Sequence, residues 1–120
     1  MNVTLKIPGY SIKLTSKRKV VPNDVLYLRA DVNYTEIVLK NGENFTVPKT
    51  LKELEKVFSP FDFFRTHKSF MVNLHHVEGY QLHEGLLVKL NGKHSVNLSR
   101  RRKDDFLKSI NSFPKKFLLN

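Results

Sequence analysis

The chain has 120 residues, 40% of them hydrophobic, which suffices for one domain with a core and is too short for two ordinary domains. Its 21 lysines and arginines against 11 aspartates and glutamates give a formal net charge of +10, which favours a polyanionic partner such as nucleic acid. Cysteine is absent, so disulfides and thiolate metal sites are excluded, and we expect a cytoplasmic protein.

The first part of the chain alternates hydrophobic and polar residues, which is the period typical of strands. Pro8-Gly9 and Pro22-Asn23 interrupt this alternation, as turn residues do. The alternating segments are 3–7 (VTLKI), 11–15 (SIKLT) and 24–32 (DVLYLRADV). We therefore expect β structure within residues 1–19, followed by a longer strand.

Two Asn-Gly pairs predict hairpins, because these residues tolerate the positive φ of a type I′ turn. Asn41-Gly42 and Asn91-Gly92 each lie between two alternating segments, which are 34–40, 43–47, 86–90 and 93–98. A third turn at Glu84-Gly85 would extend the second hairpin into a three-stranded meander over residues 77–98.

One helix interrupts the strands, in the segment TLKELEKVFSP (50–60). Thr50 can accept a hydrogen bond from the amide of Glu53 while the Glu53 side chain reaches back, which is a capping box. Ser59-Pro60 ends this helix. Its apolar face consists of Leu51, Leu54 and Phe58, and a second short helix over 101–113 would use Phe106, Leu107 and Ile110. The sequence therefore predicts a mainly β architecture with an inserted helix and a short C-terminal helix.

The segment FFRTHKSFMVN (63–73) places basic residues inside a hydrophobic run. Regular alternation would put Lys68 on the same side as Phe64 and Phe70, so we expect a turn near Lys68. The two phenylalanines would anchor its flanks, His67 and Ser69 would brace it, and Lys68 would point outward. A merely solvated lysine at a loop tip explains this stretch equally well.

The basic residues are concentrated near the two ends of the chain, which predicts a charged face. They include Lys13, Lys17, Arg18 and Lys19 near the start and Lys93, Arg100, Arg101, Arg102 and Lys103 near the end. Consecutive cations at a helix N-terminus oppose its macrodipole, so another interaction should favour them. Arg100 directly follows the last predicted strand, and a guanidinium suits both guanine and phosphate. A solvated helix start is the alternative.

Asn33 interrupts an otherwise regular strand pair in the segment ADVNY (30–34). Its amide can donate and accept hydrogen bonds at once, which fits an adenine edge. An asparagine is equally common in a simple turn.

The sequence has no pattern that predicts catalysis or a cofactor. Phosphate-binding glycine loops and Gly-x-Ser-x-Gly are absent, and HEGLL (83–87) lacks the second histidine of a zinc helix. His75 and His76 are adjacent on what reads as extended chain, so they should point to opposite faces. No apolar run approaches the ~20 residues that span a membrane. We expect no enzyme, no cofactor, no metal site and no membrane partner.

Four segments together resemble the LytTR-type DNA-binding domain of bacterial response regulators. They are DVLYLRADVNYTEIVLKNG, TLKELEKVF, FFRTHKSFMVNLHHVEGY and VNLSRRRKDDFLK, and the F-x-R-x-H-x-S-x-x-V-N and S-R-R patterns make the resemblance specific. It covers about residues 20–110 of a single domain, with an extra β segment at 1–19 and a tail at 111–120. It implies an elongated stack of small, mostly antiparallel sheets whose loops enter successive major grooves of bent duplex DNA.

The resemblance also implies which residues contact DNA. Base contacts are expected from Asn33, Lys68 and Arg100, which should converge on a common edge. Phosphate contacts or bracing are expected from Tyr34, Arg65, His67, Ser69, Asn73, Ser99, Arg101 and Arg102. The expected partners are double-stranded DNA with direct repeats, a second protomer on that DNA, and a receiver or sensor domain or protein.

Two other functions are consistent with a small basic β protein. A β-barrel that binds single-stranded RNA would stack bases on exposed aromatic residues, whereas most of the nine phenylalanines lie where core packing explains them. A module that docks on an acidic protein or an anionic lipid would show no preference among DNA sequences.

Overall fold

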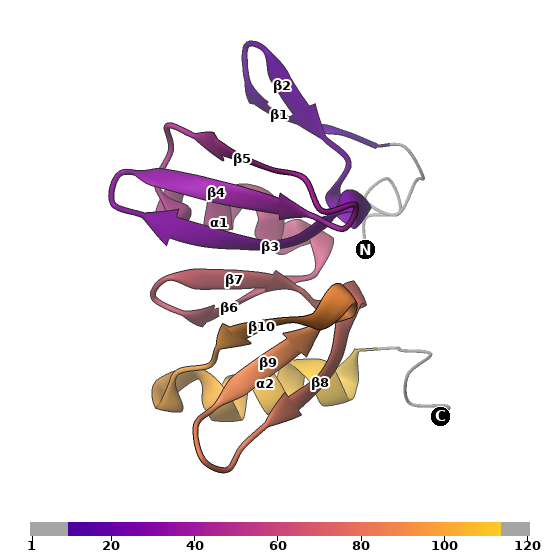
Figure 1. The fold of residues 1–120 in the computed structure, drawn as a ribbon, viewed down its shortest axis with the longest axis vertical. Helices are drawn as coiled ribbons and strands as arrows, with labels where there is room; N and C mark the ends of the chain where they lie inside the picture. The colour runs from indigo at the N-terminus through magenta and orange to yellow at the C-terminus, as the bar shows by residue number, and fades with distance from the viewer. Residues whose placement is uncertain (1–9, 114–120) are drawn as a thin grey trace.

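Three antiparallel sheets are stacked along the longest axis of the computed structural model, which describes residues 10–113 (Figure 1). The principal extents are 42 × 34 × 26 Å. The expected mainly β stack is therefore confirmed. The predicted strand at 3–7 lies outside the described residues.

The sheets contain two, five and three strands. The first pairs β1 (Ile12–Thr15) with β2 (Arg18–Val20). The second has the order β5-β4-β3-β7-β6, formed by β3 (Val25–Asp31), β4 (Tyr34–Leu39), β5 (Asn44–Val47), β6 (Phe63–His67) and β7 (Phe70–Asn73). The third is the predicted meander of β8 (Val77–Gln81), β9 (Leu87–Leu90) and β10 (His94–Asn97).

Both Asn-Gly hairpins form, but the predicted type I′ turns are wrong. Such a turn needs positive φ at both central residues, and positive φ occurs at Gly42 (97°) in the first loop and at Gly92 (80°) and Lys93 (71°) in the second. The reason is loop length. Leu39 donates its N–H to the carbonyl of Glu43, and Leu90 is paired with His94, so three residues rather than two separate the last bonded residues of each hairpin.

Two helices cover the sheets. Helix α1 (Leu51–Phe58) begins with the predicted capping box, in which Thr50 Oγ1 accepts from the Glu53 amide at 3.2 Å and Glu53 Oε1 accepts from the Thr50 amide at 2.8 Å. Helix α2 (Arg100–Ser112) begins one residue earlier than predicted, because Ser99 caps it by accepting from the Arg102 amide at 3.2 Å.

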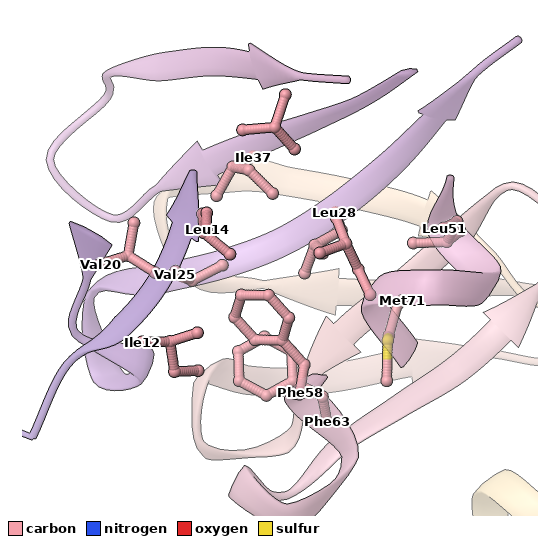
Figure 2. Packing of buried hydrophobic residues seen from close by; sticks show 12 residues of the cluster. Ile12, Leu14, Val20, Val25, Leu28, Ile37, Leu51, Phe58, Phe63 and Met71 are labelled. Atoms are coloured by element: carbon pink, nitrogen blue, oxygen red, sulfur yellow. The ribbon is translucent and has the colours of Figure 1, made fainter. Parts of the chain in front are cut away.

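Strand β7 separates two hydrophobic cores, because successive side chains of a strand point to opposite faces. Met71 belongs to the first core, with the buried residues of α1, β1 and β2, and Val72 belongs to the second, with the third sheet and α2. Figure 2 shows the first core, where the rings of Phe58 and Phe63 lie 4.9 Å apart between centroids. Burial on both faces of the five-stranded sheet fixes its register, and therefore also the positions of the turns at its ends.

Candidate nucleic-acid interface

The turn between β3 and β4 consists of Val32 and Asn33. Asp31 and Tyr34 form the last pair of the hairpin, and Arg29 Nη2 lies 2.7 Å from Glu36 Oε1 across the two strands. The hydrogen bond to Glu36 raises the pKa of Arg29. Asn33 is exposed, and so is Tyr34. The hairpin therefore holds Asn33 in solvent at a defined point.

The turn between β6 and β7 consists of Lys68 and Ser69. His67 Nδ1 accepts from the Ser69 amide at 3.0 Å, which is the bracing role expected for His67. The rings of Phe64 and Phe70 are half-buried against the second core, as flanking anchors would be. Lys68 itself is exposed.

The guanidinium of Arg65 holds this turn from within. Its Nε donates to the His67 carbonyl at 3.0 Å, its Nη2 to the Lys68 carbonyl at 2.7 Å, and its Nη1 to Glu55 Oε1 on α1 at 2.7 Å. The side chain of Arg65 is only 19% exposed. This geometry gives Arg65 a bracing role.

The third segment is the junction between β10 and α2. The Ser99 amide donates to the Thr66 carbonyl at 2.8 Å, and Arg102 Nε donates to the Arg65 carbonyl at 2.9 Å, so the start of α2 is joined to β6. The guanidinium of Arg102 also lies 5.3 Å from the centroid of the Phe64 ring. Arg100 and Arg101 remain exposed.

Hydrogen bonds join the three segments into one edge. The Ala30 amide donates to the Ser69 carbonyl at 2.9 Å, which links the first turn to the second, and the bond between Ser99 and Thr66 links the second to the third. In Figure 1 the β3–β4 turn, the β6–β7 turn and the start of α2 follow one another along the left edge of the molecule. Asn33, Lys68 and Arg100 are all exposed there.

Two clefts run along the lower half of this edge. One of about 350 Å³ is lined by Lys68 and Arg101, and one of about 750 Å³ is lined by Arg100. His67 and Ser99 line both clefts, so Lys68 and Arg100 flank a common pair of residues. Within residues 10–113, neither Lys68, Arg100 nor Arg101 forms an ion pair, whereas Arg65 does. These cations therefore give the edge a positive charge.

Asn73 lies in the interior, away from this edge. Its Nδ2 donates to the carbonyls of Pro22 at 3.2 Å and Val25 at 2.9 Å, its Oδ1 accepts from the His75 amide at 2.9 Å, and it is 1% exposed. Of its two expected roles, this position fits only bracing. By accepting from His75, Asn73 caps a 3-10 turn over Leu74–His76, so the prediction that the two adjacent histidines lie on extended chain is wrong.

Residues 10–113 contain no group of three or more histidine, cysteine, aspartate or glutamate side chains that could hold a metal ion. In the same range, no helix is long and apolar enough to cross a membrane.

Sequence reasoning overlooked two residues of this edge. Glu55, on α1, is the partner of Arg65, and no local pattern pairs them because ten residues separate the two. Val32 is 88% exposed and has a φ of 57°, which costs a β-branched residue about 1–2 kcal/mol. The sequence did contain a signal for Val32, because turns usually carry glycine, asparagine or aspartate at such a position and here it is a β-branched residue.

Comparisons with known proteins show which family this sequence is similar to. The family model of the LytTr DNA-binding domain matches residues 16–111. The CO-responsive transcriptional regulator RcoM of Rhodospirillum rubrum is 41% identical over 66 residues, which are 53% of this chain and 28% of that protein. The chain thus spans about a quarter of the length of this relative.

A solved structure has the same fold. It is the LytTr DNA-binding domain of a Bacillus cereus protein described as a methyl-accepting/DNA response regulator, with a TM-score of 0.69 and 25% sequence identity. The match covers 87% of this chain and 96% of that one.

Proposed function

Because this chain belongs to the family of LytTr DNA-binding domains, we propose that it binds double-stranded DNA sequence-specifically as part of a bacterial transcriptional regulator. One observation carries the proposal: Asn33, Lys68 and Arg100 come from distant parts of the chain, and their segments are joined by hydrogen bonds along one edge. Within the described chain their side chains are exposed and unpaired, which is what contact with base edges requires.

The chemistry of the three side chains suits the major groove. The Asn33 amide can pair with adenine, and Lys68 and Arg100 can donate to the acceptors of guanine. Arg101, also exposed on this edge, supplies a charge for phosphate. Base contacts would provide selectivity, and phosphate contacts most of the affinity.

The arrangement of the segments supports contact along one side of the duplex. They follow one another along the longest axis of the molecule, so each turn would meet a different part of the DNA. Two protomers on direct repeats would extend the contact along one side of the DNA. A receiver or sensor, on the same or another polypeptide, would control binding in the cytoplasm.

The two other functions have less support. None of the phenylalanines in residues 10–113 is exposed, so a stacking platform for single-stranded RNA would have only tyrosines such as Tyr34 and Tyr80. A module for acidic proteins or anionic lipids would use the positive edge but would not need exposed amide and guanidinium groups at defined points.

Selection from random duplexes tests the proposal. After several rounds the bound DNA is sequenced, and its affinity is measured by fluorescence anisotropy at a fixed salt concentration. We expect an enriched direct repeat, weak competition by single-stranded RNA, and loss of the enrichment in the triple variant N33A/K68A/R100A. A wild-type protein that enriches no duplex sequence would contradict the proposal.

A further inference from the structure

Val32 combines two unfavourable features at one position. Its φ of 57° lies in the left-handed region, which suits glycine or asparagine and rarely a β-branched residue. Its side chain is 88% exposed, so no packing compensates for this backbone conformation. Folding alone would favour glycine or asparagine here, and a valine indicates an interaction made outside the chain.

Val32 lies on the same edge of the molecule as the expected base contacts. It directly precedes Asn33 at the tip of the β3–β4 hairpin, on the edge that also carries Lys68 and Arg100. Five large hydrophobic residues are exposed within residues 10–113, and two of them, Val32 and Tyr34, flank Asn33. The tip therefore presents apolar groups on both sides of a polar amide.

Duplex DNA offers one apolar group on the major-groove edges of its base pairs, the 5-methyl group of thymine. A short branched alkyl side chain beside an amide would match a thymine next to the base that the amide contacts. The exposed cations farther along this edge, Lys68, Arg100 and Arg101, favour this polyanionic partner over an apolar protein surface. We propose that Val32 packs against the 5-methyl group of a thymine and so selects a T·A pair at one position. This inference rests on the proposed function.

Deoxyuridine, which lacks only the 5-methyl group, gives a direct test. Each thymine of the selected duplex is replaced in turn, and anisotropy gives the affinities of the wild type, Val32→Ala and Val32→Asn. At one position the replacement should weaken wild-type binding about fourfold, the effect of one buried methyl group. Both variants should bind the duplex with thymine at that position and the duplex with deoxyuridine there with equal affinity.

Two controls separate this contact from a general effect. Val57→Ala truncates another exposed valine, on α1, and should leave the fourfold discrimination of the wild type intact. Val32→Asn should show a higher thermal midpoint, because asparagine fits the left-handed conformation better, so its loss of discrimination cannot result from unfolding.

The outcomes also distinguish this inference from the proposed function. Equal responses of the wild type and Val32→Ala at every thymine, with binding still sequence-specific, would overturn the inference alone. A selected site without thymine would do the same. A protein that prefers no duplex sequence would overturn the proposed function and the inference with it.

Discussion

The guanidinium of Arg65 donates to the backbone carbonyl of Lys68 across 2.7 Å. Its Nε donates to the carbonyl of His67, and its remaining terminal nitrogen pairs with Glu55. Arg65 therefore holds the turn whose outward side chain is Lys68, and the planar fork suits this because it reaches several acceptors in fixed directions. Arg65, whose charge would also suit a phosphate, donates here to the backbone carbonyls of His67 and Lys68.

This relationship predicts that Arg65→Gln weakens specific binding without removing a phosphate contact. We expect about a tenfold loss of affinity for the selected duplex, which corresponds to one charge-assisted hydrogen bond of about 1.5 kcal/mol. The slope of log affinity against log salt should stay that of the wild type. Salt titration by anisotropy measures both quantities, and a slope reduced by about 0.9 would instead assign Arg65 to a phosphate.

Arg100 and Arg101 are adjacent, but we expect their substitution to have different effects on DNA binding. Arg100→Ala should relax the preference at one base pair, with a loss of discrimination of about 1–3 kcal/mol. Arg101→Ala should weaken binding to all duplexes alike and reduce the salt slope by about 0.9. Each variant is taken through duplex selection and salt titration. An unchanged base preference in Arg100→Ala would remove its proposed role.

Asn73 should matter for stability rather than for DNA recognition. Asn73→Ala leaves the buried carbonyl of Val25 without this donor, at a cost of about 1–3 kcal/mol, whereas the Pro22 carbonyl still accepts from the Val25 amide. Urea unfolding should show this loss, whereas Asn44→Ala, an exposed asparagine on β5, should change the free energy of unfolding by less than about 0.5 kcal/mol. A variant of normal stability with altered base preference would contradict this assignment.

The capping box of α1 should make stability depend on pH. Hydrogen bonds from the Thr50 backbone amide and then from its hydroxyl hold the pKa of Glu53 below its usual value of about 4.5. Since the pKa is lower in the folded state, this stabilisation is complete above the unfolded pKa and is lost as the pH falls through the folded one. Glu53→Gln cannot titrate, so the stability difference between wild type and variant should narrow in acid. Urea unfolding at neutral and acidic pH measures this difference, and a constant value would contradict the prediction.

Much of the fold could be predicted because its signals are local. Alternation predicted the strands, Asn-Gly and Glu-Gly pairs located the hairpins, and Thr50 with Glu53 marked the start of α1. The turn type was wrong because it depends on how many residues the paired strands leave between them. That number is set by register, and burial on both faces of the sheet sets the register in turn.

The candidate site was only partly visible in the sequence. Residue types marked Asn33, Lys68 and Arg100 only as candidates, and the family resemblance implied them as a set. The described structure shows all three exposed on segments of one edge. The sequence could not separate bracing from DNA contact. A cation or an amide is equally suited to bracing and to DNA contact. Which of the two it does depends on whether its donors lie within hydrogen-bond distance of an acceptor in the protein itself.

The sequence by itself determined the elements, the basic charge and the family resemblance, since these follow from residue types and short spacings. Only the tertiary structure decided that Asn73 is buried and bonded to Pro22, 51 residues away. It also decided that the guanidinium of Arg65 is hydrogen-bonded to Glu55 and two backbone carbonyls, and that Val32 is exposed with a positive φ. Hydrogen bonding, burial and backbone conformation depend on which distant segments become neighbours, and packing of the two cores on either side of β7 establishes those neighbours.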